Sequence, residues 1–524
     1  MRIAICQVNP TVADLAGNVS LCLDFARKAA SLSPDLIVFP EMVIPGYPPR
    51  DILYDESFVE AALAASTDFA AQCEGLPPVL FGSIARNGRE GRANRLLPGL
   101  LNVAFLAQHG KICVAAEKRL LPVYDVFYEP RWFTPGAFRA PLEIGGRKVG
   151  VLVCEDLWDA DYDIHPADEL KAAGAQVLVC LSASPYRQGV LGQRLAQARR
   201  VLPGADALVF ANLVGANDEL IFDGRSFALN AGGVQFAPGF EQACALFDIA
   251  DAKPDAAPGV KFQITNLEYL AADDELAAAL ALGISDFARK NGLGRAFLGL
   301  SGGIDSALAL VLAVKALGAD NVTGVAIPSR FSDPRSAESA RALCQNLGCA
   351  FEQVELESLH VAAEKSLQHL AGEAPGVMLE NVQARLRMLV LMAYVNQFGG
   401  FLLNTSNKTE LALGYSTLYG DMAGALCPLA DLTKPQVYSL ARHLGAEVIP
   451  AYIFERPPSA ELREGQVDPF DYNKISPELE EIVQADGSHP ALKRSEHKRW
   501  QFGIVLKVSE RAFGSGRMIP VTKR

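Results

Sequence analysis

Short apolar runs of strand length recur through residues 1–250, and Gly, Pro and charged residues separate them. Ala-rich amphipathic stretches such as residues 18–30 lie between several of these runs, which predicts helices packed against a largely buried sheet. No run reaches the roughly 18 apolar residues that would cross a bilayer. The pattern therefore predicts an α/β sandwich without a membrane span. The runs read DLIVFP, VLFGSI, LNVAFLA, KVGVLVC, QVLVCLS and ALVFANLV.

A break in this pattern at residues 251–275 divides the chain. The segment has little periodicity and is rich in Pro, Asp and Ala, as connections between domains often are. A chain of 524 residues also exceeds what one hydrophobic core usually supports. We therefore predict a first domain at residues 1–250, a connection at 251–275 and a second domain at 276–524.

Helices and strands are predicted to alternate in the second domain. The pattern predicts a helix over 278–290, the strand AFLGL, a helix over 305–317, the strand VTGVAIP, a helix that ends at Gly348 and the strand AFEQVEL. Such alternation produces a parallel sheet whose ligands bind beyond the carboxyl ends of its strands. The second domain is therefore predicted to be a doubly wound parallel α/β sheet.

Composition limits the kinds of binding partner and the cellular compartment that we expect. A net charge of -12 argues against broad nucleic-acid binding, so small molecules are expected, with no nucleic acid and no membrane. The ten cysteines are spread along the chain without a CxxC pair and the seven histidines are scattered, which predicts reduced thiols and no His/Cys metal cluster. The opening MRIAICQVNPT is typical of a first strand rather than of a signal peptide. We therefore expect a cytoplasmic protein.

Three reactive side chains directly follow apolar runs in the first domain. Glu41 follows DLIVFP, Lys118 follows ICVAAE and Cys154 follows KVGVLV. If these strands share a sheet and run parallel, the three side chains meet at one edge. A thiol is nucleophilic as the thiolate, and a nearby ammonium with a carboxylate base supplies the required charge and proton acceptor. Each residue alone would more often be structural, but together they suit amide hydrolysis.

The text around these residues resembles the nitrilase superfamily. The segments FPEMVIPGYPPRD, EKRLLPVYDVFYEPRWF and VCEDLW carry the resemblance. It implies a four-layer αββα domain in which Glu41 is the general base, Lys118 stabilises an oxyanion and Cys154 forms a glutamyl thioester. The glutamine-binding set that it implies comprises Tyr47, Glu129, which supports the site, and Ser182 or Ser184, although their segment SASP is also typical of an ordinary turn.

The segment LGLSGGIDSALAL places a glycine pair between a strand and a helix, where backbone N–H groups can hold phosphate. It lacks the GK[ST] ending of nucleotide-hydrolase loops. SGGxDS after a strand resembles the signature of the ATP pyrophosphatases, which have a Rossmann-like sheet and adenylate a substrate oxygen. The resemblance implies that ATP is a co-substrate, that Asp305 binds Mg²⁺, and that phosphates contact Ser301, Gly302, Gly303, Asp305 and Ser306.

The later segments resemble NAD synthetases, in order, across nearly the whole second half. They read ENVQARLRM, NTSNKTELALGYSTLYGDMAG, LTKPQVY, PPSAEL and SEHKRWQ. The resemblance implies that ammonia from glutamine amidates ATP-adenylated deamido-NAD, and that at least two chains associate through a helix of the second domain. The implied residues are Thr405 and Lys434 for ATP, Glu410 and Ser459 beside Asp305 for Mg²⁺, and Arg385, Arg387, Asp421, His497 and Lys498 for deamido-NAD.

Two alternatives stay open at this point. Another glutamine-using ATP pyrophosphatase, such as a GMP synthetase, would share the SGGIDS motif, and a nucleotide-sensing regulator could retain the scaffold without the chemistry. Individual residues also have structural interpretations, because Glu410 could favour a helix N-terminus and Lys434 could be a solvated cation. Arg385 and Arg387 could likewise be solvated flanks of a helix whose other side carries an apolar stripe.

Overall fold

The computed structural model describes residues 1–88, 99–249, 271–370, 376–485 and 490–516. The chain divides into two compact units, one of residues 1–217 with 221–269 and the other of residues 218–220 with 270–524. Most of the predicted connection at 251–275 lies outside the described residues. Its last part is not a connection, because helix α5 (Ala272–Lys290) begins inside it, ahead of the predicted start near residue 278.

Two six-stranded sheets form the centre of the first unit. The first has the order β14-β1-β2-β3-β4-β5, with β1 (Arg2–Gln7), β2 (Leu36–Val38), β3 (Val79–Arg86), β4 (Leu100–Gln108), β5 (Lys111–Glu117) and β14 (Ala243–Asp248). The second has the order β13-β12-β9-β8-β7-β6, with β6 (Leu142–Ile144), β7 (Arg147–Val153), β8 (Val177–Ser182), β9 (Ala207–Asn212), β12 (Phe227–Asn230) and β13 (Gly233–Phe236). The short strands β10 (Val214–Asn217) and β11 (Leu220–Asp223) pair with each other.

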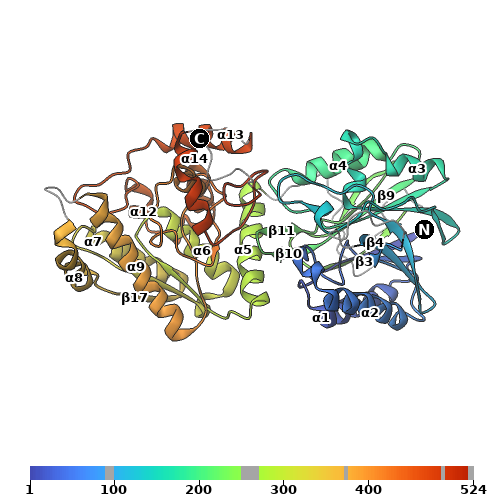
Figure 1. The fold of residues 1–524 in the computed structure, drawn as a ribbon, viewed down its shortest axis with the longest axis horizontal. Coiled ribbons are helices and arrows are strands. Elements are labelled where there is room, and N and C mark those ends of the chain that lie inside the picture. The colour runs from blue at the N-terminus through green and yellow to red at the C-terminus, as the bar shows by residue number, and fades with distance from the viewer. Residues whose placement is uncertain (89–98, 250–270, 371–375, 486–489, 517–524) are drawn as a thin grey trace. The chain divides into compact units, whose positions relative to one another are not determined.

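The core of this unit consists of three apolar layers. Because side chains alternate along a strand, Ile3 and Ile5 of β1 join the core between the two sheets, while Ala4 and Cys6 join the core beneath the helices. Helices α1 (Leu15–Ala30) and α2 (Glu56–Gln72) cover the first sheet, and α3 (Pro166–Ala172) and α4 (Val190–Val201) cover the second, as Figure 1 shows. The predicted four-layer αββα sandwich is confirmed.

A parallel four-stranded sheet with the order β17-β16-β15-β18 forms the centre of the second unit. Its strands are β15 (Ala296–Gly299), β16 (Val322–Ala326), β17 (Ala350–Gln353) and β18 (Phe401–Leu402). A parallel pair, β19 (Leu426–Cys427) with β20 (Ile504–Val505), lies outside this sheet. The predicted parallel α/β sheet is confirmed. The helices are α5, α6 (Ile304–Leu317), α7 (Pro334–Leu347), α8 (Glu357–Leu367), α9 (Val377–Phe398), α10 (Lys408–Leu413), α11 (Lys434–Gly445), α12 (Ala451–Glu455), α13 (Tyr472–Gln484) and α14 (Pro490–Ser495).

A buried ion pair fixes α4 to the second sheet of the first unit. Arg194 is fully buried, and its Nη1 donates to both carboxylate oxygens of Asp223 at 2.8 and 3.0 Å. Its other nitrogens donate to the Ser184 hydroxyl at 3.0 Å and to the Ser184 carbonyl at 2.7 Å. Here both carboxylate oxygens accept from one guanidinium nitrogen and the other nitrogens have partners of their own, so the buried charge is tolerated. Arg194 thus also sets the position of the Ser184 segment.

We predict that Arg194→Ala lowers the free energy of unfolding of the first unit by about 3–5 kcal/mol, because the Asp223 carboxylate is left buried and unpaired. Urea unfolding followed by tryptophan fluorescence measures this loss. Arg199→Ala, on the exposed side of the same helix, is the matched control and should change stability by less than about 0.5 kcal/mol. Equal effects of the two substitutions would contradict the structural role given to the Arg194–Asp223 pair.

Candidate active sites

Glu41, Lys118 and Cys154 come together from two different sheets. Glu41 follows β2 and Lys118 follows β5, which are strands of the first sheet, whereas Cys154 follows β7 of the second. The expectation that one shared sheet edge gathers the three residues was therefore wrong. They meet because the two sheets pack face to face, so that the ends of strands from both layers reach one place.

A buried ammonium held between two carboxylates forms the centre of this first site. Lys118 Nζ lies 2.9 Å from Glu41 Oε1 and 2.8 Å from Glu129 Oε1, and all three side chains are buried. Burial disfavours the charged ammonium, but Glu129 and Glu41 overcome this and raise the pKa of Lys118. Burial raises the pKa of Glu129 to about 7, although Lys118 opposes the shift. The Tyr47 hydroxyl donates to Glu129 Oε1 at 3.1 Å.

The Cys154 thiol lies beside this cluster. It is the first residue of a short 3₁₀ turn (Cys154–Leu157) and has a φ of 46°, a left-handed conformation that is uncommon outside glycine. The Ser182 hydroxyl donates to its Sγ at 3.3 Å. Burial and the Glu41 carboxylate raise the pKa of the Cys154 thiol, and Lys118 and Ser182 only partly offset them. The thiolate therefore requires transfer of the proton to a base.

Two polar contacts that the sequence did not reveal fix the Glu41 carboxylate. Asn102 Nδ2 donates to Oε1 at 2.7 Å, and the backbone N–H of Ala183 donates to Oε2 at 2.9 Å. Asp156 was also missed, although it lies within the VCEDLW segment. Its carboxylate accepts from the backbone N–H groups of Arg119, Leu120 and Val153, and so joins the segment after Lys118 to the turn at Cys154.

The two serines expected at the glutamine site have different surroundings. Ser182 contacts Cys154, as described, whereas the Ser184 hydroxyl accepts from buried Arg194 and its backbone N–H donates to Asn212. Ser182 is therefore beside the reactive sulfur, and Ser184 belongs to a buried network behind it. Which of them contacts glutamine stays a prediction.

In the second unit, a cavity of about 270 Å³ gathers most of the residues predicted for nucleotide chemistry. It lies at the ends of β15 and β18 and at the start of α6, where ligands of parallel sheets bind. Glycine is required at position 302, because its φ is 70° and an added Cβ would come within 2.6 Å of Ser336 Cα. The predicted residues that line the cavity are Ser301, Gly303, Asp305, Ser306, Arg387, Thr405, Glu410, Asp421, Lys434 and Ser459.

A second buried ammonium lies between two carboxylates in this cavity. Lys434 Nζ is 2.5 Å from Asp305 Oδ2 and 3.1 Å from Glu410 Oε1, and Asn407 Nδ2 donates to Asp305 Oδ1 at 2.9 Å. Burial raises the pKa of Glu410 to about 7, with Lys434 opposing the shift. Burial disfavours the Lys434 ammonium, but Asp305 and Glu410 raise its pKa. Lys434 is therefore not a solvated cation.

The carboxylates of Asp305 and Glu410 suit a magnesium site, whereas the Ser459 hydroxyl makes other contacts here, so its predicted role as a third ligand stays a prediction. Both carboxylates face the Lys434 ammonium, so they lie close enough to share one cation. Mg²⁺ binds one or two carboxylates, and phosphate oxygens and water complete its coordination. The Ser459 hydroxyl instead donates to the Gln466 carbonyl at 2.5 Å and accepts from the Glu461 N–H at 3.1 Å. In the described part of the chain, no three His, Cys, Asp or Glu side chains form a metal cluster.

The residues expected to bind deamido-NAD are divided between the cavity and its surroundings. Asp421 lines the cavity, and burial raises its pKa to about 6 although the Thr417 N–H donates to it at 2.6 Å. Lys498 Nζ donates to the carbonyl of Gly414 at 2.7 Å. His497 is exposed in the 3₁₀ turn Glu496–Gln501 and is not among the cavity residues.

Of the two arginines of α9, one lines the cavity and the other does not. Arg387 lines the cavity of its own chain and donates to the Ile327 carbonyl at 3.1 Å. Arg385 is exposed and donates to the Leu418 carbonyl at 3.0 Å. Arg387 can therefore contact a ligand without a second subunit. The apolar stripe predicted on α9 is buried only in part, because Val390 is buried but Leu389 is 55% exposed.

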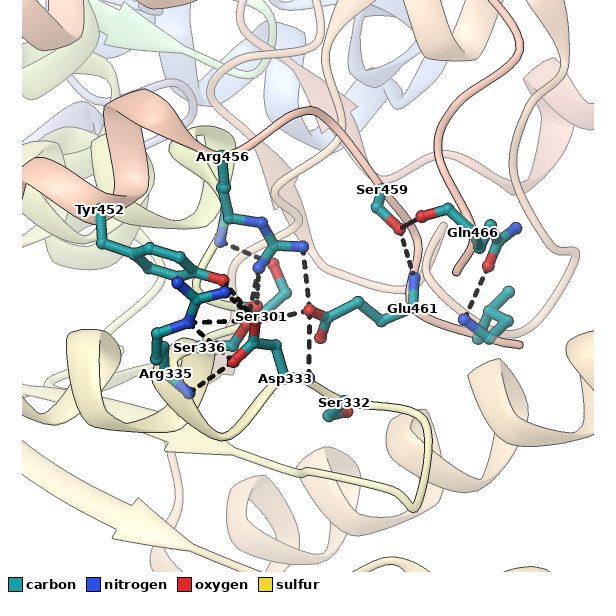
Figure 2. Close-up of polar contacts among 12 residues, drawn as sticks. Ser301, Ser332, Asp333, Arg335, Ser336, Tyr452, Arg456, Ser459, Glu461 and Gln466 are labelled. Atoms are coloured by element: carbon teal, nitrogen blue, oxygen red, sulfur yellow. Dashed lines mark hydrogen bonds and ion pairs between the residues drawn. The ribbon is translucent and has the colours of Figure 1, made fainter. Parts of the chain in front are cut away.

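Ser336, Arg456 and Glu461 are among the cavity residues that the sequence did not reveal. Figure 2 shows them joined beside Ser301, with Arg456 Nη1 donating to the Ser336 hydroxyl at 2.7 Å and its Nη2 at 3.1 Å from Glu461. The available signal was ERPPSAEL, in which Arg456 and Glu461 lie on either side of the segment that contains Ser459. Ser459 was the only residue of this segment that was predicted to belong to the site.

Comparison with known proteins finds relatives of both units. Residues 2–234 match the carbon-nitrogen hydrolase family and residues 276–502 match the NAD synthase family. Glutamine-dependent NAD(+) synthetases of Synechocystis sp. and Rhodobacter capsulatus are 38% and 37% identical to the chain, covering 99% and 100% of it and 98% of each relative. The structure of the glutamine-dependent NAD+ synthetase from Acinetobacter baumannii in complex with ADP has a TM-score of 0.78 at 30% identity, over 99% of this chain and 98% of that chain.

The fold and the two sites define a carbon-nitrogen hydrolase domain joined to an NAD synthase domain in one chain. The chain matches curated relatives over nearly their full length. The chain belongs to the glutamine-dependent NAD(+) synthetases. The GMP synthetase alternative is therefore set aside.

We predict that Glu129 makes stability depend on pH. Its pKa is raised from the usual 4.5 to about 7, so between these values the folded chain binds more protons than the unfolded chain, and stability falls as pH rises through this window. Glu129→Gln removes this contribution. The stability of the native chain relative to the variant, measured by urea unfolding at pH 5, 6, 7 and 8, should decrease up to about pH 7 and then level off. A difference that increases with pH would contradict the raised pKa.

Proposed function

We propose that the chain makes NAD from deamido-NAD, ATP and glutamine, with AMP, pyrophosphate and glutamate as the other products. The observation that supports this most strongly is that one chain, similar over its full length to glutamine-dependent NAD(+) synthetases, contains both clusters, each built on a buried lysine between two carboxylates. One cluster lies beside a thiol and the other beside a phosphate-binding loop. The first cluster thus provides a site for amide hydrolysis, and the second provides a site for ligation.

In the first unit, Cys154 attacks the side-chain amide of glutamine. Glu41 accepts the thiol proton, because the pKa of the partly buried Cys154 thiol is raised and the thiol therefore stays protonated until a base takes its proton. Lys118 stabilises the negative oxygen of the tetrahedral intermediate. Glu41 then returns the proton to the departing ammonia, and the glutamyl thioester is hydrolysed by water. Glu129 keeps Lys118 protonated and in place, and Tyr47, Ser182 and Ser184 are the proposed glutamine-binding residues.

In the second unit, the carboxylate of deamido-NAD attacks the α-phosphorus of ATP and pyrophosphate leaves. Ammonia then attacks the acyl adenylate, and AMP leaves. Asp305 and Glu410, with Ser459 as the further predicted ligand, would hold Mg²⁺, which supplies positive charge to the phosphates when bound. Ser301, Gly302, Gly303, Ser306, Thr405 and Lys434 are proposed to bind ATP, and Arg385, Arg387, Asp421, His497 and Lys498 to bind deamido-NAD.

We also propose a cytoplasmic homodimer formed through the second domain. The partly exposed apolar side chains of α9, among them Leu389, support an association of this kind. No helix in the described part of the chain is long and apolar enough to cross a membrane.

Cys154→Ala should abolish glutamine-dependent NAD formation and leave the ammonia-dependent rate largely intact, because the thiolate is needed only for the thioester. The assay compares glutamine with ammonium chloride at equal protein concentration. Cys113→Ala, at an exposed cysteine of the same unit, is the matched control and should retain both activities. Loss of both activities in a folded Cys154→Ala protein would contradict the proposed division of labour.

Asp305→Asn should lower NAD formation with either nitrogen source by about 100-fold or more, because it removes a carboxylate from a site for a hard cation and weakens the hold on Lys434. Release of glutamate from glutamine should continue in the variant. The measurement is NAD formation at limiting and at saturating magnesium. A near-normal rate with ammonia at limiting magnesium would remove Asp305 from the proposed site.

A further inference from the structure

A single carboxylate oxygen in the second unit accepts from three different donors. Glu461 Oε1 lies 2.9 Å from the Ser336 hydroxyl, 3.1 Å from Arg456 Nη2 and 3.4 Å from the backbone nitrogen of Asp333, the residue that precedes α7. Figure 2 shows this convergence, with the Glu461 side chain directed at Arg456 and Ser336. A charged donor, a hydroxyl and a helix N-terminus together form a receptor for an anionic oxygen.

The receptor adjoins the phosphate-binding loop. Arg456 Nη1 donates to the carbonyl of Ser301 at 3.3 Å, and Gly302 approaches the backbone of Ser336 so closely that no side chain fits between them. Arg456, Ser336 and Glu461 line the same cavity as Asp305 and Ser306. The Asp333 carboxylate turns away to Arg335 and Tyr452. A phosphate held by the SGGIDS loop would therefore lie beside the donors that Glu461 now uses.

We propose that Arg456, Ser336 and the Asp333 N–H form a receptor for the pyrophosphate part of ATP, and that the Glu461 carboxylate fills this receptor before ATP binds. This inference rests on the proposed function. Arg456 is then a ligand of the leaving pyrophosphate, and Glu461 is an internal competitor for it. The guanidinium suits both states, since its planar donors match carboxylate and phosphate oxygens equally well.

The exchange requires the Glu461 side chain to move out of the receptor, so the contacts of its segment decide whether this is possible. Residues 459–466 form a turn closed by their own hydrogen bonds, from the Ser459 hydroxyl to the Gln466 carbonyl at 2.5 Å and from the Leu462 N–H to the Gln466 side chain at 2.7 Å. A separate contact, from Gln383 Nε2 of α9 to the Leu462 carbonyl at 2.8 Å, holds the turn from outside. Further links run from Arg463 to Glu380 at 3.7 Å and from Gln466 to the Tyr415 hydroxyl at 3.4 Å. The exchange therefore needs the Glu461 side chain to rotate away, while Arg456 and Ser336 stay at the phosphate loop.

Competition of this kind makes the measured affinity for pyrophosphate depend on how often the receptor is empty. Removing the charge of Glu461 frees the donors, so affinity rises. Removing the guanidinium of Arg456 deletes the receptor itself, so affinity falls and the gain from changing Glu461 disappears. This dependence of one substitution on the other separates a competitor from a residue that merely shapes the loop.

The test measures binding of inorganic pyrophosphate to the full-length protein by calorimetry, and the KM for ATP in ammonia-dependent NAD formation. We expect Glu461→Gln to tighten pyrophosphate binding by about 3- to 10-fold. Glu455→Gln removes an equal charge at an exposed position next to Arg456 and should leave binding unchanged. Arg456→Ala should weaken pyrophosphate binding and raise the KM for ATP by about 10-fold or more, with partial recovery in Arg456→Lys and with the KM for deamido-NAD little changed.

In the Arg456→Ala background, Glu461→Gln should bring no further gain. Unchanged or weaker pyrophosphate binding in Glu461→Gln would overturn the competition, and this variant decides the matter even if Arg456→Ala does not fold. Normal binding in a folded Arg456→Ala protein would overturn the receptor. A native chain that binds pyrophosphate as described but makes no NAD would instead count against the proposed function alone.

Discussion

A buried ammonium held between two carboxylates is the arrangement on which both sites depend. Lys118 lies between Glu41 and Glu129, and Lys434 lies between Asp305 and Glu410. Taking such charges out of water costs several kcal/mol for each ion, and only close pairing with further hydrogen bonds offsets this. In both units further hydrogen bonds support that pairing, from Asn102 and the Ala183 N–H to Glu41 and from Asn407 to Asp305.

The two clusters use the same electrostatics for different chemistry. At Lys118, the neighbouring Cys154 thiol is partly buried and its pKa is raised, so in the proposed mechanism negative charge on the sulfur or on an intermediate oxygen is stabilised by the ammonium. At Lys434, the carboxylates leave room for a cavity lined by a glycine loop and a helix N-terminus, a setting for phosphates. The extra negative charge of two carboxylates becomes useful there when a divalent cation and a polyphosphate are bound together.

Each unit contains a largely buried arginine that pairs with a carboxylate, and the two pairs differ in their surroundings. Arg194 is wholly buried and satisfied within the sandwich, where it holds the Ser184 segment beside the thiol site. Arg456 is also largely buried, but its partner Glu461 belongs to a turn that closes on itself, so the pair can separate without disrupting a core. A permanent pair stabilises the scaffold, whereas an exchangeable pair leaves a set of donors that an anionic ligand can take over.

The sequence by itself determined the two kinds of sheet and named the residues that we propose for the chemistry. Apolar runs of strand length with helical patterns between them are local properties, and Glu41, Lys118, Cys154 and the SGGIDS loop follow strands directly. The start of α5 was misplaced because its Asp-rich first turn, Asp273–Glu275, resembles a connection in composition. The tertiary structure alone decided that Cys154 reaches Glu41 and Lys118 from the opposite sheet. It also decided that Arg456 reaches Ser301 from 155 positions away and Glu461 reaches Ser336 from 125 positions away. Such contacts depend on how layers pack and where a distant turn lies, and neither leaves a periodic signal in the chain.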